Sequence, residues 1–182
     1  YFIGKIQEII TKLGYKIAGW EEIVNGGTTL DKDLMVFSWL GEEAGFKAAE
    51  AGFPVVMTPA KYLYFDLAYS SDVKEPGLYW AGYNNPKIIY SYYPLSNNSN
   101  STIKENIKGV QACLWSENLG YPRRTNKDKL PTNYVACPYE YMTFPKMTAF
   151  SEVAWSLHKN RDWDKFVNNY SYEKKILDLF DI

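Results

Sequence analysis

Histidine and cysteine are scarce in this chain, whose 182 residues include one histidine and two cysteines. A histidine-based metal site and a Ser-His-Asp triad are therefore excluded, because His158 stands alone and no Cys-x-x-Cys spacing occurs. We expect neither a metal nor another cofactor. Cys113 and Cys137 are expected to be buried thiols, since isolated cysteines usually behave as small apolar residues.

An excess of charge of one sign is also missing. Lys and Arg total 20 against 21 Asp and Glu, which gives a net charge of -1. Without a basic stripe, nucleic acid and anionic membranes are not expected partners. No apolar run approaches the roughly 18 residues of a membrane span, and no signal peptide opens the chain. Because Tyr1 lies within a helical pattern, we interpret the chain as a processed or excised segment.

Short apolar stretches alternate with stretches of helical periodicity. The expected strands are residues 15–20, 34–39, 53–57 and 109–115, and the expected helices are residues 2–13, 42–51, 86–90, 139–157 and 163–180. Residues 60–108 are otherwise expected to be irregular. Strands that are apolar throughout indicate a parallel sheet covered by helices, so the fold class is α/β. No Gly-x-Gly-x-x-Gly follows the first strand, which argues against a dinucleotide-binding fold.

Aromatic and acidic side chains gather at the ends of these strands. Trp20, Trp39 and Trp115 end the first, second and fourth strands, and the loops supply Tyr64, Asp66 and Glu117. Functional side chains at strand carboxyl ends are typical of a (β/α)8 barrel, of which four strands would be half. A single tryptophan is more often a core residue, but three at equivalent ends favour a site. Indoles and phenols suit the apolar faces and hydroxyl rims of sugars.

Several motifs carry a family resemblance. They are Ala18-Gly19-Trp20-Glu21-Glu22-Ile23, Trp39-Leu40-Gly41, Tyr64-Phe65-Asp66, Glu75-Pro76, Trp115-Ser116-Glu117 and the run from Phe144 to Ser156. Together, and in this order over residues 1 to 157, they resemble the family-20 glycoside hydrolases, the β-N-acetylhexosaminidases. The resemblance implies that residues 1–182 are the C-terminal half of a TIM-barrel catalytic domain, about strands 5 to 8, with the other strands upstream of Tyr1.

The resemblance also implies roles for the matching side chains. Trp20, Trp39 and Trp115 would wall the pocket for the acetamido group of a terminal N-acetylhexosamine, and Tyr64 would donate its hydroxyl to the acetamido oxygen. Asp66 and Glu117 would accept hydrogen bonds from the ring hydroxyls of that sugar, at C4 and C6. Trp80 would lie over the next sugar or the aglycone.

Family-20 enzymes use the substrate's own acetamido oxygen as the nucleophile. Their acid and their acetamide-orienting carboxylate form an adjacent Asp-Glu pair, and this chain contains no Asp-Glu dipeptide. The family's sugar-binding arginine is missing too. Glu21-Glu22 and Glu42-Glu43 match other family positions and are expected to form salt bridges or support the site. We therefore expect the isolated chain to be inactive. The alternative is a non-catalytic carbohydrate-binding module derived from such a barrel.

The same reasoning sets expectations for partners and compartment. The expected partners are glycans that end in N-acetylhexosamine, and the resemblance implies an extracytoplasmic location, periplasmic, secreted or lysosomal. Half a barrel would leave two sheet edges open and barrel-facing side chains exposed, so the chain is expected to self-associate. The exposed side chains are expected among Ile17, Val36, Phe37, Val55 and Leu114, in whatever alternation the strands adopt.

Overall fold

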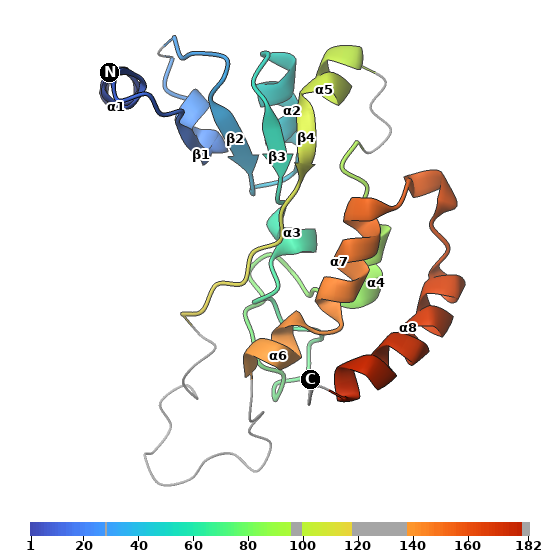
Figure 1. Ribbon diagram of the computed structural model, residues 1–182. Helices are drawn as coiled ribbons and strands as arrows, with labels where there is room; N and C mark the ends of the chain where they lie inside the picture. Colours follow the sequence, from blue (N-terminus) through green and yellow to red (C-terminus); the bar gives the residue numbers. More distant parts are fainter. Residues whose placement is uncertain (28, 96–99, 118–137, 180–182) are drawn as a thin grey trace, which may run out of the picture. The chain divides into compact units, whose positions relative to one another are not determined.

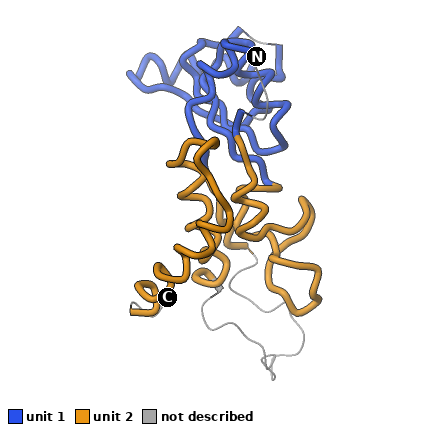
Figure 2. The backbone as a smooth tube through the Cα atoms, turned by 90° about the vertical axis from the view of Figure 1, so that its right-hand side faces the viewer, with its two compact units in different colours: residues 1–60, 94–111 blue, residues 61–93, 112–182 orange. Residues whose placement is uncertain are grey.

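The computed structural model describes residues 1–27, 29–95, 100–117 and 138–179. Cys137 lies outside the described residues. The chain divides into two compact units, each built from two segments of sequence (Figure 2). Unit 1 comprises residues 1–60 and 94–111, and unit 2 comprises residues 61–93 and 112–182. Within the described part of the chain, no helix combines the length and the apolar character needed to cross a bilayer.

Unit 1 is a four-stranded parallel sheet with helices (Figure 1). Its elements are α1 (Phe2–Lys12), β1 (Ala18–Trp20), η1 (Glu21–Val24), β2 (Met35–Ser38), α2 (Glu42–Glu50), β3 (Val55–Met57), α5 (Ser101–Asn106) and β4 (Ile107–Val110). The strands lie side by side in the order β1-β2-β3-β4, which is also their order in the chain. The predicted α/β class and the predicted parallel sheet are confirmed.

The two faces of this sheet are buried to different degrees. Helix α2 packs against β2 and β3 and is flanked by α5. Val36, Ser38, Val55 and Met57 are completely buried, and a Cβ on Gly45 of α2 would lie 2.5 Å from the Met57 sulfur. The alternate side chains of the same strands are half-buried. Coverage by helix α2 therefore explains why one face of the sheet is buried.

The half-buried face carries Trp20 and Phe37, whose rings meet edge to face with centroids 6.1 Å apart. The alternation that the sequence left open turns Val36 and Val55 toward α2, so these two of the five named side chains are buried. Phe37 is half-buried, as are Ile17 and Leu114. The half-buried face of the sheet is thus formed by the strand residues that alternate with the buried valines.

The fourth strand begins and ends earlier than expected, at Ile107–Val110 rather than residues 109–115. It follows α5 directly, and α5 was not expected because it lies in a stretch rich in Asn and Ser. Its N-cap is Asn100, whose side-chain oxygen accepts from the backbone N–H groups of Thr102 and Ile103. The prediction that Trp115 ends this strand was therefore wrong.

Unit 2 is largely helical. It contains most of α3 (Ala60–Leu63), α4 (Pro86–Ser91), α6 (Pro138–Thr143), α7 (Lys146–Trp155), η2 (His158–Asn160) and α8 (Trp163–Asp178). Helix α4 packs against α7, and their core includes Ile89, Ala149 and Val153. The helix expected over residues 139–157 is divided, because Pro145 lacks the N–H that a continuous helix needs. The helices expected near residues 86–90 and 163–180 are confirmed as α4 and α8.

Candidate functional site

In unit 2 one predicted aromatic side chain, Tyr64, contacts two others, Trp80 and Trp115. The Tyr64 ring lies 6.0 Å from the Trp80 ring at an interplanar angle of 80° and 6.2 Å from the Trp115 ring at 54°. Tyr64 is 5% exposed, whereas Trp80 is 55% and Trp115 is 40% exposed. The phenol is thus enclosed by two indoles that remain open to solvent. Edge-to-face and tilted ring pairs of this kind are favourable beyond the area they bury.

Backbone pairing brings Tyr64 beside the segment that carries Trp115. The N–H of Phe65 donates to the carbonyl of Cys113 at 2.7 Å, and the N–H of Cys113 donates to the carbonyl of Leu63 at 2.8 Å. Residues 64 and 113 form a parallel bridge. Trp115 therefore follows a separate extended segment beyond β4. Cys113 itself is half-buried, contrary to the expected full burial.

Asp66 is the buried carboxylate of this group, with 2% of its surface exposed. Its Oδ1 accepts from the backbone N–H of Trp115 at 3.4 Å. Burial raises the pKa of Asp66, while donated backbone N–H groups and the charge of Lys146 oppose that rise, and Glu117 adds to it. Glu117 is exposed. Unit 2 therefore brings together Tyr64, Asp66, Trp80, Trp115 and Glu117, all predicted from the sequence.

The loop that carries Trp80 is fixed to the Asp66 segment by its backbone. The N–H of Leu78 donates to the Asp66 carbonyl at 2.8 Å, and the N–H of Ala68 donates to the Leu78 carbonyl at 2.7 Å. Gly77 adopts a φ of +110°, and a Cβ there would lie 2.7 Å from the Asp66 carbonyl oxygen. Only glycine allows this approach of the two segments. Buried Asn84 closes the loop by donating from Nδ2 to the Tyr64 carbonyl at 3.2 Å.

Unit 1 holds the other two predicted tryptophans. Trp20 ends β1 and is 36% exposed, and Trp39 follows β2 directly. The adjacent residues Glu21 and Glu22 both bind Trp39. Glu21 accepts from the backbone N–H groups of Trp39 at 2.8 Å and Leu40 at 2.7 Å, and Glu22 accepts from the Trp39 indole at 3.1 Å. This glutamate pair thus fixes both the backbone and the ring of Trp39.

The role of Glu21 and Glu22 is more specific than the sequence indicated. They were expected to form salt bridges or to support the site, and the structure gives them hydrogen bonds to Trp39. Sequence spacing cannot reveal this pairing, because it joins residues 18 apart. The signal that could have found it is the carboxylate pair placed immediately after a strand that ends in tryptophan.

Glu21→Ala is expected to destabilise the protein by about 2–4 kcal/mol, because two backbone N–H groups lose a buried acceptor. Glu21 is 2% exposed, so water cannot easily replace the carboxylate. Glu22→Ala is the control: it removes an exposed indole bond and should cost less than about 1 kcal/mol. Urea unfolding curves of both variants provide the measurement, and equal losses would contradict the proposed difference in burial.

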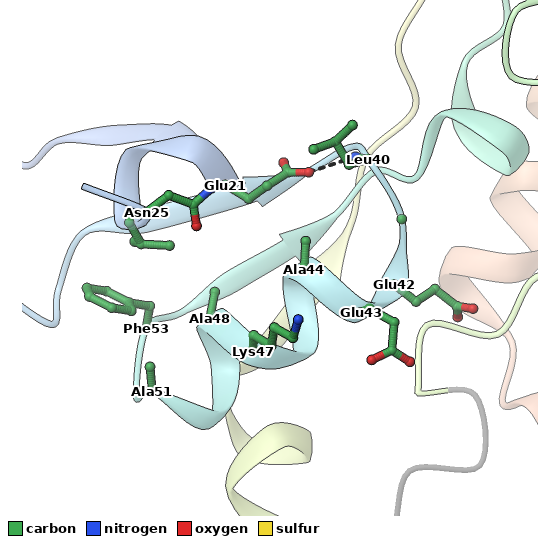
Figure 3. Close-up of a pocket in the computed structure, with 12 residues that line it drawn as sticks. Glu21, Asn25, Leu40, Glu42, Glu43, Ala44, Lys47, Ala48, Ala51 and Phe53 are labelled. Carbon is green, nitrogen blue, oxygen red and sulfur yellow. Dashed lines mark hydrogen bonds between the residues drawn. The ribbon is translucent and has the colours of Figure 1, made fainter. Parts of the chain in front are cut away.

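A separate cleft of about 620 Å³ lies between η1 and α2 in unit 1 (Figure 3). It is lined by Val24 and Asn25, by the loop at Leu40 and Gly41, and by the α2 side chains of Glu43 and Lys47. None of the predicted sugar-binding residues lines it. Among the residues that the structure describes, no group of three His, Cys, Asp or Glu side chains could hold a metal ion.

Residues 1–158 match the family described as "Glycosyl hydrolase family 20, catalytic domain". The chain is 32% identical over 143 residues to the Beta-hexosaminidase of Vibrio furnissii, covering 78% of this chain and 21% of that protein. It is 32% identical over 167 residues to the Beta-N-acetylhexosaminidase of Cellulomonas fimi, covering 90% of this chain and 30% of that protein. The chain thus spans less than a third of the length of either relative.

A solved structure is similar over the whole chain. The GH20 exo-β-N-acetylglucosaminidase from Vibrio harveyi, crystallised in complex with N-acetylglucosamine, superposes with a TM-score of 0.83 at 32% identity. The match covers 100% of this chain and 26% of the Vibrio harveyi chain. At this identity the likeness concerns sequence as well as fold.

Proposed function

The chain belongs to glycosyl hydrolase family 20, and from this premise we propose that it is part of a β-N-acetylhexosaminidase. The enzyme would remove terminal, non-reducing N-acetylhexosamine residues from glycans. In this proposal residues 1–182 supply the C-terminal half of a (β/α)8 catalytic barrel. The full-length protein of this proposal is the polypeptide that also contains the upstream half.

The sheet of unit 1 supports the barrel proposal. Its four parallel strands follow one another in chain order, without the reversal that defines a doubly wound sheet. One face is buried by α2, and the other carries Trp20 and Phe37 at half exposure. In a barrel the helices cover the outer face and the alternate side chains fill the interior. The difference between the two faces fits that arrangement.

The observation that carries the functional proposal is the group around Tyr64 in unit 2. A buried phenol between two indoles, next to a buried carboxylate, provides an apolar surface for a sugar ring and polar groups for its substituents. We assign the acetamido group to Tyr64 and Trp115, the ring hydroxyls to Asp66 and Glu117, and the next sugar or aglycone to Trp80.

The proposed mechanism is retaining and substrate-assisted. The acetamido oxygen attacks the anomeric carbon, the bond to the leaving oxygen breaks, and an acid from the upstream half protonates that oxygen. Water then attacks the anomeric carbon, the bond between that carbon and the acetamido oxygen breaks, and the water's proton returns to the conjugate base of the same acid, which restores both the acetamide and the acid. Tyr64 would fix the direction of the attacking oxygen, and the tryptophans would exclude water and hold the group near the anomeric carbon. The roles expected of Trp20 and Trp39, which lie in unit 1, stay predictions.

A carbohydrate-binding module without catalysis is the second candidate. The chain contains no Asp-Glu dipeptide, so the residues described here supply the binding groups without the family's acid. The two candidates differ in what the full-length protein does, because only an enzyme converts the bound glycan.

Hydrolysis of an aryl N-acetyl-β-glucosaminide by the full-length protein tests the proposal. Asp66→Asn is expected to raise KM about tenfold or more, because a neutral amide replaces a charged acceptor for sugar hydroxyls. Asp72→Asn, on the exposed part of the same loop, serves as the control. Binding of N-acetylglucosamine without turnover would favour the module, and absence of both binding and turnover would refute the site.

A further inference from the structure

Lys146, the first residue of α7, has no exposed surface. Its Nζ donates to the carbonyl of Phe65 at 2.8 Å and to the carbonyl of Leu67 at 2.7 Å. The same nitrogen lies 4.1 Å from the centroid of the Tyr69 ring. A protonated lysine has three N–H donors, so two carbonyls and one ring face match its bonding capacity.

The two carbonyls bound by Lys146 belong to the residues on either side of Asp66. The carbonyl of Asp66 itself accepts from the N–H of Leu78 at 2.8 Å, and the N–H of Phe65 is bound by Cys113 at 2.7 Å. Three consecutive carbonyls, at residues 65, 66 and 67, are therefore held by three separate bonds. The backbone that carries the Asp66 side chain has little freedom to rotate.

Stability alone does not account for a cation at this position. Burial of an ammonium is unfavourable, and the start of a helix carries partial positive charge that disfavours it further. Burial lowers the pKa of Lys146 to about 7. An apolar residue of similar volume is often neutral or stabilising in place of a buried ion. A lysine here therefore suggests a requirement for its charge or its donors.

Lys146 also acts electrostatically on Asp66. Its charge lowers the pKa of Asp66, against the larger rise caused by burial. Glu75 favours the protonated form of Lys146, and Glu117 raises the pKa of Asp66. At pH values below about 7 Lys146 is protonated, and its charge then favours the ionised form of Asp66.

We propose that Lys146 is a positioning residue for Asp66: it fixes the carboxylate through the carbonyls of Phe65 and Leu67, and its charge keeps that carboxylate ionised. The proposal rests on the role of Asp66 as a sugar-hydroxyl acceptor. It assigns to the buried lysine of the Phe144-Pro145-Lys146 segment a function in substrate binding rather than in folding alone.

Lys146→Met in the full-length protein is the test, with kcat and KM measured across the acidic and neutral pH range. We expect kcat/KM to fall about 10- to 100-fold, chiefly through KM, because the carboxylate loses its fixed direction. The acidic limb of the kcat/KM profile should move to higher pH by about one unit, since the loss of a neighbouring cation raises the pKa of Asp66. Lys146→Arg retains the charge and should keep the limb in place.

Arg161→Met is the matched control, because Arg161 is also a cation that binds two backbone carbonyls in unit 2. Its Nη1 donates to Tyr90 at 3.0 Å and to Tyr92 at 2.8 Å. This variant should lower thermal stability and leave the acidic limb unchanged. An unmoved limb in Lys146→Met would overturn the proposal. A shift of the same size in Lys146→Arg would also overturn the proposal. The arginine variant provides this test even if the methionine variant does not fold. Absence of hydrolysis by the wild-type protein would instead refute the proposed function.

Discussion

Replacing Tyr64 with phenylalanine in the full-length protein is expected to lower kcat by about 10²- to 10³-fold, with a much smaller change in KM. In the proposed mechanism the hydroxyl donates to the acetamido oxygen while charge develops during its attack. The ring would remain in place, because its contacts with Trp80 and Trp115 are made by the aromatic face and edge. Loss of a single such donor typically costs about 2.7–4 kcal/mol in the transition state.

Tyr62→Phe is the matched control for this substitution. Tyr62 lies two residues earlier in the same unit, and its ring stacks on Tyr92 with centroids 4.9 Å apart. Removal of its hydroxyl should leave kcat within about twofold of the wild-type value. Steady-state kinetics with an aryl N-acetyl-β-glucosaminide measure both variants. Wild-type kcat in Tyr64→Phe would mean that the phenol does not orient the acetamide.

The second large effect concerns residues 1–182 expressed alone, which are expected to show no hydrolysis. The chain contains no Asp-Glu dipeptide, and general acid catalysis alone typically contributes about 10²–10⁴-fold. The same assay at high protein concentration is the measurement. Turnover that disappears when a carboxylate of this chain is replaced would contradict the assignment of the acid to the upstream half.

The isolated chain is also expected to self-associate. The face of the sheet that carries Trp20 and Phe37 is not covered by α2, and among the strands that the structure describes β1 and β4 lie at the two edges of the sheet. A second copy could bury both features, most simply with two-fold symmetry. Light scattering over a concentration series would show this as a rising mass. A constant monomeric mass with a cooperative thermal transition would contradict it.

Much of the fold could be predicted because its strands are short apolar runs between helical patterns. Val36 and Val55 illustrate the limit of that signal. A continuous apolar run identifies a buried strand without showing which residues face the helices, and alternation placed both valines under α2. The fourth strand was misplaced for a related reason. Ile107–Val110 contains a lysine and a glycine, so it reads less like a strand than the apolar segment that follows it.

Members of the candidate site could be named from the sequence where their residue types match a known pattern, and could not be named where a contact joins residues far apart in the chain. Tyr64, Asp66 and Trp115 could be named in advance because their residue types match a known pattern. Lys146 could not, since it binds carbonyls about 80 residues earlier in the sequence. The signal for a buried lysine was the single charge within the mostly apolar run from Phe144 to Phe150. A lysine on the exposed surface of a helix would have produced the same sequence pattern.

The division of each unit between two segments has a consequence for synthesis on the ribosome. Strand β3 ends at Met57, but its neighbour β4 begins at Ile107, after residues 61–93 of unit 2 have been made. At about 5–20 residues per second, the growing chain carries β3 as an unpaired edge for roughly 3–10 s. The backbone bridge between Tyr64 and Cys113 likewise cannot form until Cys113 has been made. Each unit can therefore close only after its second segment has been made, and until then the nascent chain exposes an edge strand to which other chains could pair.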